Sequence, residues 1–311
     1  MQNRREFVKN TLISAAGITV LSSFDILKRS DDEFKLTILH TNDMHSRIDA
    51  FPSNDGKYPN QGGMIKIAKL IKQVRLEEEN VLLLDAGDVF QGTPYFNVFK
   101  GELEFKLMSE MGYDGSTIGN HDFDIGLDGF KNALQFANFP FICSNYDFSN
   151  TILNGSTIPY KIFKKKNIKI GVFGIGIKME GLIDSRLSGN TIYNDPINTA
   201  NYYSCLLKNE KKCNLVICLS HLGYEYSSNE ISDITLAKNT KNIDLIIGGH
   251  THTFLDSAVS LKNKENKKVL INQAGWSALK LGRVDFFFSK QKSQNTDFEA
   301  HRYFTKNYAK I

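Results

Sequence analysis

Residues 36–45 read LTILHTNDMH, an apolar run that leads straight into a polar segment containing Asp43 and His45. Four later segments have the same form, with Asp, Asn or His directly after an apolar strand candidate. Ligands of α/β sheets gather beyond the carboxyl ends of the strands, so we expect the five segments to meet at one place. The other four are DAGD (residues 85–88) after 81–84, GNHDFD (119–124) after 114–118, SH (220–221) after 215–219, and GGHTH (248–252) after 245–247.

The composition is that of a globular protein with a nearly neutral body. The chain has 311 residues, of which 41% are hydrophobic and 23% charged, with only 6 prolines. These values exclude a disordered, collagen-like or disulfide-framework protein, and the one apolar run near membrane length is at the N-terminus. Most of the formal net charge of +4 comes from the first 30 residues. The remainder gives no reason to expect a nucleic-acid partner.

The first 30 residues resemble a twin-arginine export signal. NRREFVK (residues 3–9) precedes an apolar stretch over residues 11–23, which is the charged-then-apolar order of such signals. We therefore expect a periplasmic or otherwise exported protein, with residues 1–30 as the signal and residues 31–311 as one domain. The alternative is an ordinary amphipathic helix. No Ala-x-Ala tripeptide marks a cleavage site, so an uncleaved signal that contacts the membrane stays open.

The cysteines follow no metal-binding spacing. Cys143, Cys205, Cys213 and Cys218 lie in or beside apolar segments and form no Cys-x-x-Cys pair. We interpret them as small buried apolar side chains. Pairing of Cys205 with Cys213 after oxidation stays an open alternative.

After residue 33 the chain alternates β-rich apolar runs with segments of helical period, which predicts a layered α/β fold. A single Asn separates residues 161–166 from 168–174, and this indicates an antiparallel hairpin and mixed sheets. The expected strands are residues 36–41, 81–85, 141–144, 168–175, 215–220, 245–248, 268–272 and 283–289. The expected helices are residues 65–79, 102–111, 127–137, 198–209 and 232–238.

The residue types at the strand ends suit two divalent cations. Imidazole nitrogen with carboxylate and amide oxygen fits Zn, Mn, Co, Fe or Mg, and leaves the metal undetermined. In an extended segment, side chains alternate with period two, so Asp43-x-His45 and His250-x-His252 would each point two ligands to one side. Two-metal hydrolases hold their ions about 4 Å apart. Asp88 is our candidate for the carboxylate that both ions share.

In their order along the chain, these segments resemble the calcineurin-like metallophosphoesterase superfamily. The longer runs GDVFQGT (87–93) and GYDGSTIGNHDFD (112–124) resemble the bacterial 5′-nucleotidase and 2′,3′-cyclic phosphodiesterase family in particular. The resemblance implies an α-β-β-α sandwich: two layered, mixed sheets flanked by helices. Nucleotidases of this family usually carry a C-terminal substrate-binding domain as well. We expect this chain to hold the metal domain alone, because it stops at Ile311.

The resemblance also implies which residues bind metal. The first ion would be held by Asp43, His45, Asp88 and His252, and the second by Asp88, Asn120, His221 and His250.

The remaining roles implied by the resemblance lie in residues 120–124. His121 and Asp124 would be the catalytic pair, with the imidazole assisting the leaving oxygen and the carboxylate orienting the ring. Asn120 and His121 would also bind the phosphoryl group of the substrate. Asp122 stands where the family more often has Glu. We expect little effect from this difference, since the family does not use that position as a ligand.

These features predict an exported two-metal phosphohydrolase that acts on small phosphate esters, nucleotides above all. Two cations would neutralise the ester and lower the pKa of a water, whose hydroxide attacks the phosphorus in line. A separately encoded nucleotidase-domain protein is a candidate partner for base recognition. Two alternatives stay open. One is a cyclic-nucleotide or other phosphodiesterase of the same superfamily, and the other is a metal-bearing, non-catalytic subunit of a split nucleotidase.

Several conspicuous residues are expected to have structural roles only. His40 and His301 are interpreted as hydrogen-bonded structural histidines, with support of the metal ligands as an alternative for His40. Trp276 and residues 286–288 are expected to pack in the core rather than stack on a base. Residues 62–63, both Gly, are expected to form a tight turn rather than a phosphate cradle.

Overall fold

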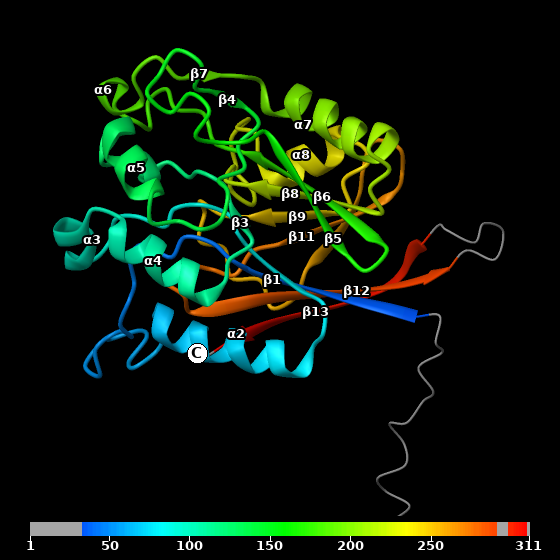
Figure 1. Cartoon of the computed structure of the whole chain (residues 1–311), viewed down its shortest axis with the longest axis horizontal. Coiled ribbons are helices and arrows are strands. Elements are labelled where there is room, and N and C mark those ends of the chain that lie inside the picture. The colour runs from blue at the N-terminus through cyan, green and yellow to red at the C-terminus, as the bar shows by residue number, and fades with distance from the viewer. Residues whose placement is uncertain (1–32, 291–297, 310–311) are drawn as a thin grey trace, which may run out of the picture.

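Two stacked β-sheets form the centre of the computed structural model, which describes residues 33–290 and 298–309 (Figure 1). The expected export signal at residues 1–30 lies outside these ranges. The first sheet has the order β13 (Phe298–Ala309), β12 (Lys280–Lys290), β1 (Glu33–Thr41), β2 (Val81–Asp85), β3 (Gly115–Ser116). The second has the order β10 (Val259–Lys262), β11 (Lys268–Asn272), β9 (Leu245–Gly248), β8 (Leu215–Ser220), β6 (Ile168–Ile175), β5 (Tyr160–Lys165). Strands β4 (Tyr146–Asp147) and β7 (Ile192–Tyr193) form a separate pair.

The sheets are mixed, as expected, and their parallel strands carry the site. In the first sheet β1, β2 and β3 run parallel, and β12 and β13 are antiparallel additions. In the second sheet β6, β8, β9 and β11 run parallel, and β5 and β10 are antiparallel edges. The carboxyl ends of parallel strands share one edge of a sheet. The polar segments that follow these strands are thereby brought to that edge.

Helices cover the outer face of each sheet, which completes the expected α-β-β-α arrangement (Figure 1). The first sheet is covered by α2 (Met64–Glu77), α3 (Pro94–Phe99), α4 (Glu102–Met111) and α5 (Gly126–Leu134). The second is covered by α7 (Pro196–Cys205), which continues as the π-helical η2 (Leu206–Glu210), and by α8 (Asp233–Asn239). Two short elements, the 3-10 helix η1 (His121–Phe123) and α6 (Ser185–Ser188), lie in the connecting loops. Among the described residues, no helix has the length and apolar character needed to cross a membrane.

Strand side chains alternate between three hydrophobic clusters. Ile38 faces the cluster between the sheets, while Leu39 faces the cluster under α2, α4 and α5. In the second sheet, Ile217 faces the cluster between the sheets, while Val216 faces the cluster under α7 and α8. Because both faces of these strands are buried, their sequences are nearly continuous apolar runs. Strand-forming segments of this kind therefore stand out in the sequence.

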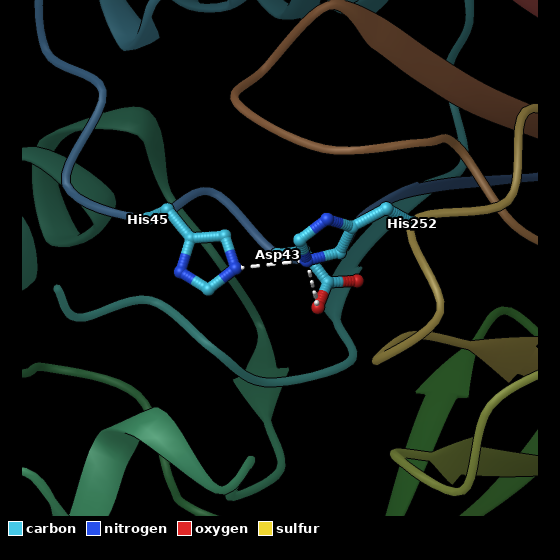
Figure 2. Close-up of side chains that lie close together, drawn as sticks. All are labelled: Asp43, His45 and His252. Carbon is cyan, nitrogen blue, oxygen red and sulfur yellow. Dashed lines mark hydrogen bonds and ion pairs between the residues drawn. The ribbon is translucent and has the colours of Figure 1, made fainter. Parts of the chain in front are cut away.

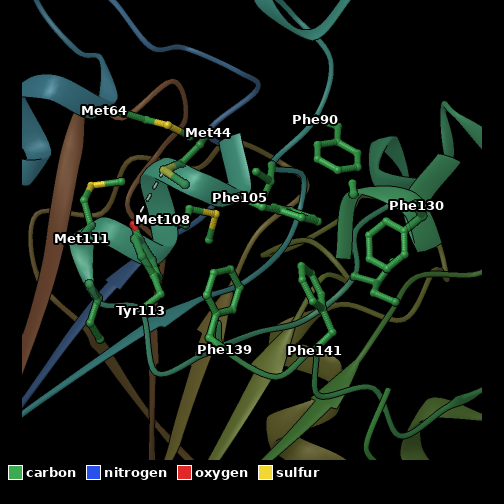
Figure 3. Packing of buried hydrophobic residues seen from close by; sticks show 14 of the residues in the cluster. Met44, Met64, Phe90, Phe105, Met108, Met111, Tyr113, Phe130, Phe139 and Phe141 are labelled. Carbon is green, nitrogen blue, oxygen red and sulfur yellow. Dashed lines mark hydrogen bonds between the residues drawn. The ribbon is translucent and has the colours of Figure 1, made fainter. Parts of the chain in front are cut away.

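The cluster on the outer face of the first sheet is rich in aromatic rings and methionines (Figure 3). The rings of Phe105 and Phe141 have centroids 5.0 Å apart, and those of Phe90 and Phe105 are 4.8 Å apart. Met44 is fully buried in this cluster. It anchors the polar segment after β1, because its neighbours on either side are Asp43 and His45.

Most expected elements form within a few residues of their predicted ends. Helix α4 matches the expected 102–111 at both ends, and β5 and β6 pair as the expected antiparallel hairpin. All four cysteines are free thiols, three of them buried. Gly63 directly precedes α2 at a φ of 92°, where a Cβ would lie 2.6 Å from the Asp49 carbonyl carbon, so the backbone approaches closely here as a glycine allows.

One expected strand does not form, and four strands of the structure were not expected. Residues 141–144 do not form a strand: Phe141 and Ile142 make single bridges, to Ser116 and Ile158 respectively. Each bridge goes to a different neighbour, so no ladder can develop. The short paired strands β4 and β7 were not expected, nor were β10 and β13. Strands β10 and β13 lie at sheet edges, where side chains are partly exposed and the apolar pattern is weak.

Candidate metal centre

Two groups of side chains at the carboxyl edge bring possible ligand atoms within 4.8 Å of one another. They contain six of the seven residues that sequence analysis proposed as ligands. The seventh, Asn120, contacts the second group. The first group is Asp43, His45 and His252, and the second is Asp88, His221 and His250.

The first group closes around a single point between three side chains (Figure 2). His45 Nε2 lies 3.0 Å from His252 Nε2, which lies 3.4 Å from Asp43 Oδ1. If both nitrogens bound one ion at about 2.1 Å, with an angle of about 90° at the ion, they would lie about 3 Å apart. The distance between the two Nε2 atoms agrees with this. The other ring nitrogen of His45 donates to the Phe90 carbonyl at 3.1 Å. That bond leaves the Nε2 lone pair free for a cation.

The second group is built around a buried carboxylate. Asp88 Oδ2 lies 3.0 Å from His221 Nε2 and 4.0 Å from His45 Nε2, so this carboxylate stands between the two groups. His221 Nδ1 donates to the Ala86 carbonyl at 2.6 Å. Asn120 Oδ1 lies within hydrogen-bond distance of His250 Nδ1, at 2.7 Å, which places the amide oxygen beside this group.

The electrostatics of the second group favour a positive charge at its centre. Burial alone lowers the pKa of the fully buried His221 imidazole, but the Asp88 carboxylate, together with Asp43 and the Ala86 carbonyl, outweighs burial and raises that pKa to about 10. Asp43 and Asp88 are almost completely buried. Buried carboxylates are costly unless they are paired with cations. The donor set therefore fits two divalent metal ions, whose positive charge would replace the proton on His221.

The backbone of the ligand segments is left-handed, and this corrects the expectation of extended Asp-x-His and His-x-His segments. Asp43, His45 and Asp88 have φ values of 50°, 48° and 56°, and His250 and His252 have 71° and 52°. A left-handed conformation costs about 1–2 kcal/mol for a residue with a Cβ. Such strain gathers at functional sites. The paired side chains converge because the loops curl around the site rather than because side chains alternate.

Asp122 has a role that sequence analysis missed. Its carboxylate accepts hydrogen bonds from the backbone N–H groups of Gly119 (2.8 Å), Asp88 (3.0 Å), Val89 (3.0 Å) and Phe90 (3.3 Å). It therefore ties the loop after β2 to the loop after β3. Gly119 is needed at this junction, since a Cβ there would lie 2.2 Å from Asp88 Oδ1.

Asp122→Asn is expected to weaken metal binding by about 10- to 100-fold, the usual cost of losing a group that orients ligands. The substituted amide keeps the size of the side chain but turns an NH₂ group toward the backbone N–H groups. Competition of the protein with a chelator for Mn²⁺ measures the effect. Asp128→Asn, at an exposed position on α5, is the matched control. Equal affinity in both variants would show that Asp122 does not position the ligands.

Two further polar side chains hold the ligand loops. Asn42 Nδ2 donates to Asp43 Oδ2 and to the Gly275 carbonyl, both at 2.6 Å. Gln273 Nε2 donates to the Gly249 carbonyl at 2.7 Å, and its Oε1 accepts from the Thr253 N–H at 2.6 Å. Gln273 directly follows strand β11, just as the candidate ligands follow other strands. This position after a strand is the sequence feature that could have identified Gln273 as part of the site.

His121 and Asp124 lie together at the mouth of the metal centre. His121 Nδ1 lies 2.9 Å from Asp124 Oδ2, and the His121 ring centroid lies 5.3 Å from that of His45. The hydrogen bond to Asp124 raises the pKa of His121, with partial burial acting in the opposite direction. Both side chains are about one third exposed. The Nδ1 contact leaves Nε2 of His121 for a substrate.

Trp276 corrects the expectation of simple core packing. Its ring stacks on His252, with centroids 5.3 Å apart and planes 2° apart, and it is only partly buried. Its other edge contacts Phe51, at 5.9 Å between ring centroids. Trp276 thus orients a candidate ligand from outside. Phe286 and Phe288, by contrast, pack in the middle cluster as expected, whereas Phe287 is only partly buried and its ring contacts the Arg302 guanidinium at 4.1 Å.

The two histidines expected to be structural have different outcomes. His40 is fully buried, but neither ring nitrogen has a hydrogen-bond partner among the described residues, so the expected hydrogen bonds are absent there. Burial lowers the pKa of His40 to about 3, which keeps the ring neutral. It packs against Gly282, where a Cβ would lie 2.0 Å from Nε2. The side chain of His301 lies outside the described part of the chain.

Several known proteins are similar to this chain in sequence and in fold. The family model for calcineurin-like phosphoesterases matches residues 36–254. The snake venom 5′-nucleotidase of Crotalus adamanteus is 37% identical over 233 residues, which are 71% of this chain and 38% of that protein. The trifunctional nucleotide phosphoesterase protein YfkN of Bacillus subtilis is 32% identical over 299 residues, which are 86% of this chain and 19% of YfkN.

Among solved structures, the 5′-nucleotidase precursor from Thermus thermophilus matches with a TM-score of 0.78 and 29% identity. The match covers 89% of this chain and 55% of that protein. This chain therefore spans less than two thirds of the length of each of these relatives. On the family model and the identity to these relatives, the chain belongs to the calcineurin-like phosphoesterase family.

Proposed function

We propose that this chain is a two-metal hydrolase of phosphate esters that acts on nucleotides. The observation that carries the proposal is the meeting of two candidate ligand groups beside the His121–Asp124 pair. A structural metal site would need no such pair at its mouth. The names of the relatives, 5′-nucleotidase and nucleotide phosphoesterase, support nucleotides as the substrate class.

In this proposal each ion has four protein ligands, and one ligand is shared. Divalent ions at these positions neutralise the phosphate and supply a nucleophilic water at neutral pH. The mixed nitrogen and oxygen donors are compatible with Zn, Mn, Co, Fe or Mg. The first ion takes Asp43, His45, Asp88 and His252, and the second takes Asp88, Asn120, His221 and His250.

The chain's own residues would handle the phosphoryl group and the leaving oxygen. Asn120 and His121 donate hydrogen bonds to the phosphoryl oxygens and stabilise the charge that develops there. His121 gives the proton on Nε2 to the leaving oxygen as a general acid. Asp124 accepts the Nδ1 hydrogen bond, and thereby positions the ring and favours its protonated form.

We also propose export, with residues 1–30 as a twin-arginine signal and residues 31–311 as the phosphoesterase domain. Support comes from the NRREFVK run ahead of the apolar stretch. Replacement of Arg4 and Arg5 by Lys is expected to retain the folded, metal-loaded protein in the cytoplasm. Fractionation of cells that carry the paired variant and the wild type tests this, and equal export of both would contradict it.

A substrate panel tests the hydrolase proposal. With Mn²⁺ or Zn²⁺ the protein is expected to release phosphate from 5′-AMP, because the mouth of the site leaves His121 free to protonate an alcohol leaving group. Hydrolysis of a 2′,3′-cyclic nucleotide but not of 5′-AMP would favour the phosphodiesterase alternative. Bound metal without turnover of either would favour a non-catalytic subunit. Selectivity for 5′-AMP by this chain alone would show that a separate nucleotidase-domain partner is not needed.

A further inference from the structure

A cavity of about 590 Å³ opens beside the second group of candidate ligands. His250 forms part of its wall. The rest of the wall comes from the segment after β6, the segment before α7 and the segment after β8. Pockets of 300–1,000 Å³ with a mixed apolar and polar lining are the ordinary size for small-molecule sites.

The cavity reaches the metal centre at His250, which contacts the segment that carries His121. His250 Nδ1 lies 2.7 Å from Oδ1 of Asn120, the residue before His121. Tyr193, in the cavity wall, contacts Tyr146 at 5.9 Å between ring centroids. Tyr146 in turn contacts Phe123 in η1 at 5.6 Å. The cavity therefore adjoins the metal centre at His250, next to the segment that carries Asn120 and His121.

Apolar side chains provide much of the inner lining, and carboxylates dominate its charge. Ile177, Leu182, Leu222 and Ile231 line the cavity together with the rings of Tyr193 and Tyr226. This lining suits an organic group with an apolar face.

The charges at the rim do not cancel. Lys178 forms an ion pair with Glu180 at 2.6 Å, so these two compensate each other. Two more exposed carboxylates line the cavity: Asp195, which accepts a hydrogen bond from the Asn198 N–H at the start of α7, and Glu230. Like charges within a Debye length of about 8 Å repel one another. A bound group that carries a further phosphate would meet this repulsion, whereas an uncharged group would not.

We propose that this cavity binds the leaving group of the substrate and selects an uncharged group of nucleoside size over one that carries an additional phosphate. The inference rests on the proposed phosphohydrolase function, and it assigns to the metal domain itself a part of substrate selection.

The size of the leaving group is tested with two esters of primary alcohols, 5′-AMP and ethyl phosphate. Both present the same kind of bond to the metals, but the ethyl group is too small to use the cavity. Leu182 is 45% exposed at the cavity, so Leu182→Trp narrows it without disturbing the core. We expect kcat/KM for 5′-AMP to fall about tenfold, which is the scale of hydrophobic pocket discrimination, and kcat/KM for ethyl phosphate to stay unchanged. Leu76→Trp, 81% exposed on α2, is the matched control.

The charge of the leaving group is tested with 5′-AMP and adenosine 3′,5′-bisphosphate, with cleavage of the 5′ ester followed in both. The wild type is expected to prefer 5′-AMP by about tenfold, from repulsion by partly screened charges. Glu230→Lys is expected to remove most of this preference. Glu110→Lys, an exposed charge reversal on α4, should leave it unchanged.

The outcomes separate this inference from the proposed function. If the wild type cleaves neither 5′-AMP nor ethyl phosphate, the proposed function fails and the inference falls with it. If the wild type cleaves both, and Leu182→Trp and Glu230→Lys leave both substrate ratios unchanged, the hydrolase stands and the cavity assignment is overturned. The assignment is supported if Leu182→Trp and Glu230→Lys each change their substrate ratio while the control variants Leu76→Trp and Glu110→Lys do not.

Discussion

Asp88→Asn is expected to lower kcat/KM at least about a thousandfold and to reduce the bound metal from two ions to at most one. The Asp88 carboxylate is almost fully buried and lies between the two ligand groups, 3.0 Å from His221 Nε2 and 4.0 Å from His45 Nε2. The amide has the same size but no negative charge, so it cannot bridge two cations. Two-metal sites contribute several kcal/mol to the transition state, and each 1.36 kcal/mol is about tenfold in rate.

Metal content by mass spectrometry and steady-state kinetics on 5′-AMP measure the two effects together. Glu110→Gln makes the same chemical change at an exposed position on α4 and should behave as the wild type. The circular dichroism spectrum shows whether Asp88→Asn still folds. A folded Asp88→Asn protein with full activity and two bound ions would rule out the shared-carboxylate assignment.

The second large effect is expected from His121→Ala, with a loss of about 10²- to 10⁴-fold in kcat for 5′-AMP, the usual range for a general acid. Metal content should not change, since His121 belongs to neither ligand group. The fold should also be retained, because 38% of the side chain faces solvent and its removal leaves no large cavity in the core. Metal analysis and kinetics on the same sample measure both quantities.

The role of His121 is resolved by the choice of leaving group. A nitrophenolate leaves without a proton, so His121→Ala should impair p-nitrophenyl phosphate hydrolysis much less than 5′-AMP hydrolysis. Asp124→Asn should show the same substrate pattern with a smaller loss, because the ring remains but the neutral amide favours its protonated form less than the carboxylate does. Equal losses on both substrates would mean that His121 binds the phosphoryl group and is not the acid.

Local pattern was enough for much of the fold. Strands such as β8 are buried on both faces, so their apolar runs and the polar residues that follow them stand out in the sequence. Helix α4 is bounded by Gly101 and Gly112, and both of its ends were predicted. Edge strand β13 was missed because only some of its side chains are buried, and residues 141–144 were overpredicted because an apolar run does not specify a pairing partner.

For the site, too, the sequence predicted some features and not others. The candidate ligands could be named because Asp and His after strands are unusual residues in a repeated position. Their backbone could not be predicted, since left-handed φ at Asp43 and Asp88 is a costly state that the surrounding loops impose. Asp122, Gln273 and Trp276 were missed or misassigned because their roles depend on contacts with residues far away in the chain.

The sequence by itself determined much of the chemistry available to this protein: which side chains can donate to a metal, and most of the apolar runs that become central strands. Those properties belong to residue types and to near neighbours. Only the tertiary structure decided that Asp88 stands between His45 and His221, and that a cavity opens beside His250. Distances between the ends of different strands follow from how two sheets pack. No stretch of the chain encodes that packing alone.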